Sequence, residues 1–174
     1  CNKHCTYCII PKLRGKHRSR PTNDILYEAQ QLIRSGAKEL TLVAQDTTFY
    51  GNDLRPQTSL AELLEKLSVI SEDIWLRFLY THPESMDTHL LKIVAAHKNI
   101  CSYFDVPIQH ASDNILKKMG RGYTRDELRR LFDLIRSTVP DAALRTTIIT
   151  GFPGETKKEF ELLLNFIEEI RFDH

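Results

Sequence analysis

The sequence predicts an α/β fold in which helices cover a parallel sheet. Short apolar segments typical of buried strands alternate with longer segments whose apolar residues recur every three or four positions. The predicted strands begin near residues 39, 75, 103 and 144, so their starts are 36, 28 and 41 residues apart, and each interval contains a predicted helix. This spacing is typical of repeated βαβ units. With 174 residues the chain is shorter than the roughly 250 of a closed eight-stranded barrel, which leaves a partial barrel or an open doubly wound sheet.

The first half of the chain contains two predicted strands and three predicted helices. Residues 1–21 contain two prolines and a glycine, show no apolar period and are predicted to be irregular. Helices follow over 25–33, 59–67 and 87–96, and strands over 39–44 and 75–80. The helix at 59–67 begins with Ser59 and has Glu62 three positions later, which is the pattern of a capping box.

The second half repeats the alternation. Strands are predicted over 103–106 and 144–150, and a short helix near 114–119 ends at Gly120 and Gly122. Capping boxes at Thr124 and Thr156 open two further helices. Their apolar stripes are Leu128, Leu131, Ile135 and Val139, and Phe160, Leu163, Ile167 and Ile170. The strands lack a clean alternation of polar and apolar residues, so both faces of the sheet are expected to be covered.

Composition limits the classes of protein. Hydrophobic residues make up 41% and charged residues 27% of the chain, which excludes global disorder. No apolar run approaches the ~20 residues that span a bilayer, so no membrane partner is expected. The net charge of +1 hides a local excess, because residues 1–21 hold six cations and no acid. This basic loop, Lys12 to Arg20, predicts a contact with RNA, a solvated surface or a balance for a nearby anion.

Three of the four cysteines lie in the first eight residues. Cys1, Cys5 and Cys8 have the spacing Cys-x-x-x-Cys-x-x-Cys, which lets one loop direct three thiolates at a soft metal or an iron–sulfur cluster. A structural zinc site has four protein ligands, and His4 or His17 would supply the fourth. Three unrelated buried cysteines are the remaining interpretation. Together with the basic loop, a zinc site supports one hypothesis for the chain, a non-enzymatic zinc module that binds RNA.

The segment from Cys1 to Cys8 resembles the signature of the radical S-adenosylmethionine (SAM) family, with Tyr7 just before the third cysteine. Arg14-Gly15, the segment from Arg18 to Pro21 and the segment from Gly151 to Thr156 extend the resemblance to the methylthiotransferases. The resemblance implies a partial TIM-like (βα) barrel. It also implies that the three cysteines hold a 4Fe-4S cluster, which binds SAM at its fourth iron and cleaves it to a 5′-deoxyadenosyl radical.

Other residues follow the predicted strands, where ligands bind in parallel α/β folds. Gln45 and Asp46 would meet SAM or the substrate, or else only cap a helix. Gln109 has the same position after the strand predicted over 103–106. Arg145 would pair with the SAM carboxylate or with a structural acid. By the same resemblance, Tyr7 and Gly151 would lie near the adenine, and packing of the cysteine loop is the other interpretation of Tyr7. Thr147 replaces the first glycine of the usual Gly-x-Ile-x-Gly-x-x-Glu pattern, and Glu155 is one position late. No catalytic residue is assigned.

Two branches of the methylthiotransferases are distinguishable. The segments from Gln45 to Gly51 and from Asp105 to Ser112 resemble the RimO branch, which modifies the β-carbon of an aspartate in small-subunit ribosomal protein S-twelve. Thr81-His82-Pro83 is closer to the MiaB branch, which modifies a tRNA adenosine. Two longer matches against one shorter match favour the RimO branch.

The chain begins with Cys1 and has no initiator Met, so we expect it to be part of a longer protein. Residues 1–174 would be a fragment of the radical SAM core that lacks its first and last strands. By resemblance, an N-terminal domain with a second 4Fe-4S cluster and a C-terminal TRAM-like domain are expected outside it. The implied partners are the ribosomal protein and an electron donor such as flavodoxin or ferredoxin, in the cytoplasm.

Overall fold

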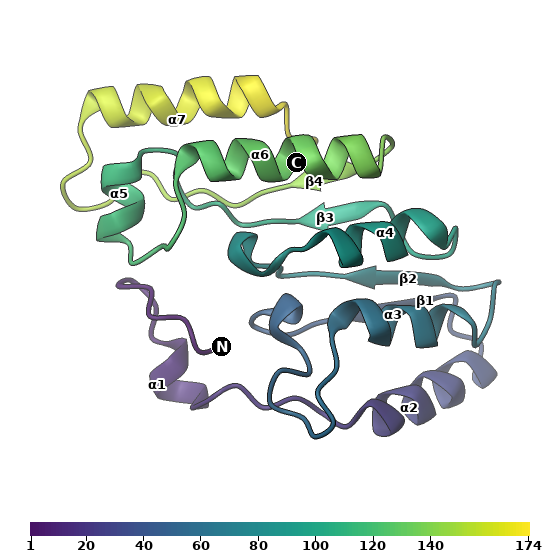
Figure 1. The fold of residues 1–174 in the computed structure, drawn as a ribbon. Helices are drawn as coiled ribbons and strands as arrows, with labels where there is room; N and C mark the ends of the chain where they lie inside the picture. Colours follow the sequence, from purple (N-terminus) through teal and green to yellow (C-terminus); the bar gives the residue numbers. More distant parts are fainter.

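The computed structural model describes all residues 1–174 and contains four parallel strands. They are β1 (Glu39–Leu42), β2 (Trp75–Phe78), β3 (Tyr103–Asp105) and β4 (Ala143–Arg145). β1 pairs with β2 and β3 pairs with β4, both in parallel. The two pairs are separate two-stranded sheets, but an isolated parallel bridge between Leu76 and Ile100, just before β3, and contacts between β2 and β3 bring them side by side. Figure 1 shows the four strands running in one direction beside the helices.

Seven α-helices and two short 3-10 helices connect and cover the strands. The α-helices are α1 (Ile10–Arg14), α2 (Thr22–Arg34), α3 (Leu60–Ser68), α4 (Thr88–Ala96), α5 (Asp113–Lys118), α6 (Arg125–Thr138) and α7 (Lys157–Ile170). The 3-10 helices are η1 (Thr47–Phe49) and η2 (Pro83–Ser85). The predicted alternation of strands and helices is confirmed. None of the helices is long and apolar enough to cross a membrane.

The predicted irregular segment is wrong at one place, because residues 10–14 form α1. Pro11 lies in its first turn, where a missing N–H costs nothing, and Gly15 ends it with φ of 73°. The helix has no buried residue, so the sequence has no periodic apolar pattern that would predict it. The strand predicted over 144–150 is also too long. It ends at Arg145, because the next amide across from it, that of Ile108, donates to the Thr146 hydroxyl instead of to a backbone carbonyl, and the two segments meet again only in an isolated bridge between Gln109 and Ile148.

The capping boxes at Thr124 and Thr156 are confirmed, since each hydroxyl accepts from the N3 amide and each N3 glutamate accepts in return. The box predicted at Ser59 is half formed. The Ser59 hydroxyl accepts from the amide of Glu62, but the Glu62 carboxylate accepts from the hydroxyl of Thr58, 2.6 Å away. The neighbouring hydroxyl therefore competes for the carboxylate that would complete the box.

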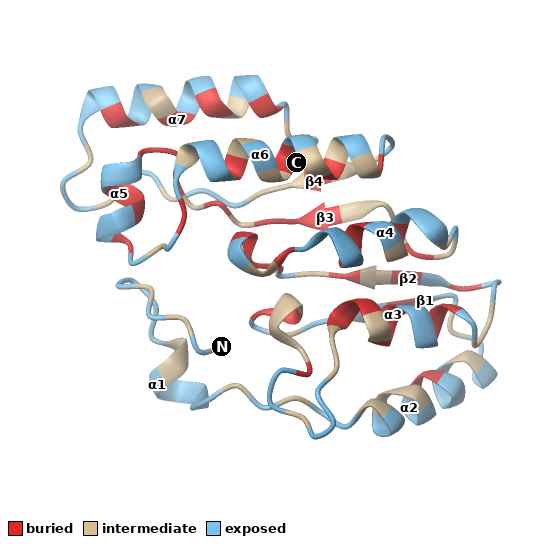
Figure 2. Cartoon of the chain, viewed as in Figure 1, coloured by how far each residue is buried: buried red, intermediate tan, exposed pale blue.

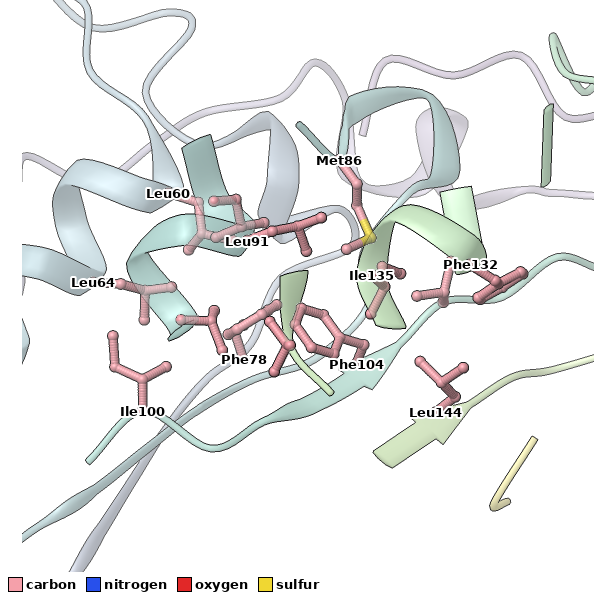
Figure 3. Close-up of a cluster of buried hydrophobic side chains, with 14 of the residues drawn as sticks. Leu60, Leu64, Phe78, Met86, Leu91, Ile100, Phe104, Phe132, Ile135 and Leu144 are labelled. Atoms are coloured by element: carbon pink, nitrogen blue, oxygen red, sulfur yellow. The ribbon is translucent and has the colours of Figure 1, made fainter. Parts of the chain in front are cut away.

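The core fills the space between the helices and one face of the strands. Figure 3 shows Phe78, Phe104 and Leu144 from the strands packing against Leu91 and Ile135 from helices α4 and α6. The rings of Phe78 and Phe104 meet edge to face with centroids 5.9 Å apart, across the junction between β2 and β3. This contact ties the two strand pairs into one hydrophobic core.

The other face of the strands is open, contrary to the prediction that both faces are covered. Burial alternates along β1, β2 and β4, as in β1, where Leu40 is buried and Glu39 and Thr41 are exposed (Figure 2). In β3 both Phe104 and Asp105 are buried. The open face is polar: the Arg77 side chain donates to Glu39 at 2.6 Å and lies over the ring of Tyr103. The alternation was hidden in the sequence because each strand has only three or four residues.

Candidate functional site

Residues 1–8 lie at the carboxyl ends of the strands, against the end of α5. The amide of Thr6 donates to the carbonyl of Met119 at 3.0 Å, and its hydroxyl donates to that of Lys118 at 2.9 Å. Lys3 forms an ion pair with Glu84 of η2. Figure 1 shows this N-terminal segment on the side of the molecule toward which the strand arrows point. Ligands bind at this edge in parallel α/β folds.

All three cysteines of the segment are free thiols. Cys1 and Cys5 are partly buried and Cys8 is exposed, and the amide of Cys8 donates to the carbonyl of Cys5 at 3.1 Å, which makes a tight turn between them. No three His, Cys, Asp or Glu side chains converge on a point that would hold a single metal ion. Three thiols on one loop nevertheless have the donor chemistry of an iron–sulfur cluster, which is held by Cys thiolates. The residues therefore fit a cluster by their donor set.

Cys101 lies apart from this group. Its amide donates to the carbonyl of Leu76, and it precedes β3, so it stands at the amino ends of the strands. Burial raises the pKa of its thiol. The fourth cysteine is therefore remote from the other three.

Tyr7 and the loop after β4 lie side by side. Tyr7 is 39% exposed, and its ring meets that of Phe152 edge to face, with centroids 6.4 Å apart. Partial burial raises the pKa of the Tyr7 hydroxyl to about 12. Gly151 has φ of 73° and no atom within 4 Å of where a Cβ would lie, so open space adjoins it. The structure thus brings together two positions that the sequence predicted near one ligand.

The polar residues after β1 play unequal parts. Gln45 is exposed. Asp46 is only 2% exposed, and its carboxylate accepts from the hydroxyl of Thr48 at 2.6 Å. Thr48 in turn accepts from the amide of His82 at 3.1 Å. Asp46 therefore holds the two loops after β1 and β2 together.

Arg145 and Gln109 lie on neighbouring strand ends. The Arg145 guanidinium donates to the buried carboxylate of Asp105 at 2.9 Å, which is the structural ion pair that the sequence left as an alternative. Gln109 has φ of 66°, and its backbone bridges to the chain after β4 through Thr147 and Ile149. Its backbone is therefore fixed, and its side chain is partly exposed at the open edge.

His110 is a fully buried histidine behind this edge. Its Nδ1 accepts from the amide of Ser112 at 2.9 Å, and its Nε2 has no hydrogen-bond partner and lies 3.6 Å from the Glu155 carboxylate. Burial lowers the pKa of the imidazole. Glu155 accepts from the amide of Phe152 at 3.1 Å, so it shapes the 151–155 loop despite its late position in the motif.

Arg121, which sequence reasoning missed, joins the cysteine segment to the strand ends. Its Nη1 donates to the Cys5 sulfur at 3.4 Å and its Nη2 to the Pro107 carbonyl at 2.7 Å. Nη1 also lies 3.1 Å from Nε2 of His82, and Nε donates to the Tyr123 hydroxyl at 2.5 Å. The one available signal was its place between Gly120 and Gly122 in the turn after α5.

The chain is similar to known proteins both in sequence and in fold. The model of the family described as "Radical SAM superfamily" matches residues 1–167. The chain is 58% identical over 174 residues to the ribosomal protein uS12 methylthiotransferase RimO of Desulfosudis oleivorans and 55% identical over 173 residues to that of Clostridioides difficile. It covers 100% and 99% of its own length in these matches but 40% and 39% of those proteins. Both relatives bear the name of the RimO branch, and the uS12 in that name is ribosomal protein S-twelve.

Solved structures confirm the predicted fold class. The radical SAM methyltransferase TsrM of Kitasatospora setae, solved with cobalamin and a 4Fe-4S cluster, superposes with a TM-score of 0.78 at 18% identity, covering 99% of this chain and 33% of that one. Methylornithine synthase PylB superposes with a TM-score of 0.65 at 16% identity, covering 99% and 48%. Similarity at this level of identity shows the fold alone, a partial TIM-like barrel.

Proposed function

This chain belongs to the radical SAM superfamily, and we propose that it is the radical SAM core of a methylthiotransferase. The substrate is an aspartate of ribosomal protein uS12, in which a C–H at the β-carbon is replaced by C–S–CH3. The observation that carries this proposal is the 58% identity to a RimO enzyme over all 174 residues. The tRNA adenosine of the MiaB branch is the less favoured substrate, because Thr81-His82-Pro83 is its one short match.

The cofactors of the superfamily are a 4Fe-4S cluster and SAM, and the thiolates of Cys1, Cys5 and Cys8 are the proposed cluster ligands. When bound, the cluster supplies the electron that cleaves SAM and so starts the radical chemistry. The segment that carries these cysteines is fixed by the two hydrogen bonds of Thr6 to the end of α5. This places the three thiols at the mouth of the partial barrel.

Side chains around the mouth are proposed to hold SAM. Tyr7 and Gly151 flank the adenine, since the ring of Tyr7 packs on the loop that carries Gly151. Gln45 and Gln109 face the open edge with side chains that are not buried and are suited to the polar end of SAM. Asp46 and Arg145 act through their existing partners, Thr48 and Asp105.

The chain spans about two fifths of the length of the curated relatives it matches, and we propose that further strands of the longer protein complete the barrel. β1 pairs with β2 on one side, and its other edge adjoins a groove of about 420 Å³. The groove is apolar and lies between α2, β1 and α3. A neighbouring strand would cover this edge. An N-terminal domain with a second 4Fe-4S cluster and a C-terminal TRAM-like domain are part of the same proposal.

The proposed electron donor is an acidic protein such as flavodoxin or ferredoxin. Lys12, Arg14, Lys16 and Arg18 follow Cys8 in the sequence and are exposed, and none of the four forms an ion pair within the chain. Cations next to a redox centre attract an acidic partner and speed its docking. The same cations are the proposed contact with RNA when uS12 is presented in the ribosomal subunit. An oxygen-sensitive cluster and this substrate suit a reducing cytoplasm.

The experiment is anaerobic reconstitution of the intact protein, followed by mass analysis of its substrates. We expect about four irons and four sulfides per cluster, and methylthiolated uS12 but unmodified tRNA. Cys5→Ala should abolish the product, while Cys101→Ala, a matched thiol at the other end of the strands, should leave it unchanged. One tightly held zinc without iron uptake would overturn the radical SAM assignment, and a modified tRNA would move the protein to the MiaB branch.

A further inference from the structure

Arg121 is the residue where four segments of the chain meet. One guanidinium reaches Cys5, His82 of the loop after β2, Pro107 of the loop after β3, and Tyr123. A planar guanidinium offers five donors in a fixed fork, which a lysine cannot reproduce. The side chain therefore links the cysteine segment directly to two strand ends.

No carboxylate forms an ion pair with the cation of Arg121, although the Glu84 carboxylate, which is paired with Lys3, is near enough to act on it. None of the ion pairs of the chain includes Arg121, although its side chain is half-buried. Its nearest polar neighbours are an imidazole, a phenol, a carbonyl and the Cys5 sulfur. Buried charges are normally paired, so an unpaired half-buried cation indicates a partner of opposite charge. The Cys5 sulfur is the one neighbour that becomes an anion when it binds a metal.

The backbone brings Cys5 to this cation. A Cβ on Gly120 would lie 2.7 Å from the carbonyl oxygen of His4, so the glycine permits the cysteine segment to approach the turn. The hydrogen bonds of Thr6 hold the segment from the other side of Cys5. The contact of Arg121 with Cys5 is thus enforced by the residues on both sides of the cysteine.

We propose that Arg121 is a positioning residue for the cluster. It fixes the Cys5 ligand and, by donating an N–H to its sulfur, favours the reduced cluster. This inference rests on the proposed function, since it assumes that Cys5 binds the cluster. Hydrogen bonds to the sulfurs are among the factors that set the reduction potential of an iron–sulfur centre. A donor that also has a positive charge stabilises the added electron most.

The test compares Arg121→Gln, Arg121→Lys and Tyr123→Phe in the intact, reconstituted protein. The readout is the reduced-to-oxidised ratio, at a fixed solution potential, of the cluster whose EPR signal changes when SAM is added. We expect Arg121→Gln to lower this ratio about tenfold, or ~59 mV for one electron. Arg121→Lys should lower it less, because the charge is kept. Tyr123→Phe removes one anchor of Arg121 but not the Cys5 contact, so it should leave the ratio unchanged.

Different results would refute the proposed function and the role of Arg121. A wild-type protein that takes up no iron would refute the proposed function. Arg121→Gln with full iron content and the wild-type ratio would refute the role of Arg121 alone. If Arg121→Gln does not fold, Arg121→Lys decides, because a wild-type ratio in that variant overturns the proposal. An equal shift in Tyr123→Phe would also overturn it, since it would make the effect one of packing.

Discussion

Replacing His82 by Gln should make the protein less sensitive to acid. His82 is 7% exposed, its Nε2 faces Arg121 at 3.1 Å, and Lys3 and Glu84 are the other charged groups around it. Burial, aided by the cations of Arg121 and Lys3, lowers the pKa of His82 to about 3 from its ordinary 6.5, against the opposing effect of Glu84. The imidazole is therefore neutral in the folded protein.

The sign and size of the effect follow from proton linkage. Below pH 6.5 the unfolded chain binds a proton at His82 that the folded chain does not bind. The titration of His82 therefore does not lower the free energy of unfolding above pH 6.5, and it lowers that free energy progressively as the pH falls from 6.5 toward 3. At 1.36 kcal/mol per pH unit, the loss between pH 7 and pH 5 is about 2 kcal/mol. Gln keeps an acceptor for Arg121 and does not titrate.

The assay is urea unfolding of the metal-free protein at pH 7, 6 and 5, for the wild type and for His82→Gln. The free energy of unfolding of the wild type should fall by about 2 kcal/mol more than that of the variant between pH 7 and pH 5. Contributions from other groups, including the buried His110, are common to both proteins and cancel in the difference. Parallel losses in the two proteins would refute a buried, neutral His82.

Three further predictions concern packing and local structure. Phe104→Ala should lower the free energy of unfolding by about 3–5 kcal/mol in urea, because the ring is fully buried between the strand pairs; a loss under ~1 kcal/mol would mean that the site is solvated. Thr156→Ala should cost about 1 kcal/mol in the same assay by removing the capping box of α7, and no change would contradict that cap. Gly120→Ala should reduce iron uptake, because its Cβ would meet the His4 carbonyl, whereas Gly36→Ala, also at positive φ but facing open space, should reduce stability without reducing iron uptake. Equal iron uptake by the two glycine variants would contradict this.

Local patterns in the sequence predicted the elements well where neighbours along the chain decide them. The capping boxes of α6 and α7 need only residues three positions apart, and both are present. The box at Ser59 failed because a neighbouring hydroxyl, that of Thr58, competes for Glu62. The predicted end of β4 was wrong for a different reason: its ladder with β3 stops where the amide of Ile108 donates to a side chain, the Thr146 hydroxyl, instead of to the backbone.

At the candidate site, too, the sequence predicted what depends on nearby residues and left open what depends on contacts between distant ones. The spacing of Cys1, Cys5 and Cys8 indicates their shared chemistry because the three lie within eight residues. The role of Arg145 was open in the sequence and depended on which acid lies across the sheet, and the structure supplies Asp105 from the neighbouring strand.

The sequence by itself determined the alternation of the strands with the longer helices, the capping boxes of α6 and α7 and the set of cysteines, since each of these depends on residues close together in the chain. Only the tertiary structure decided that Arg121 meets Cys5, 116 residues apart, and that His82 is buried against the same guanidinium. Neither contact leaves a periodic or spaced signal. They exist because parallel strands bring the loops at their carboxyl ends to one edge, whatever the distance along the chain.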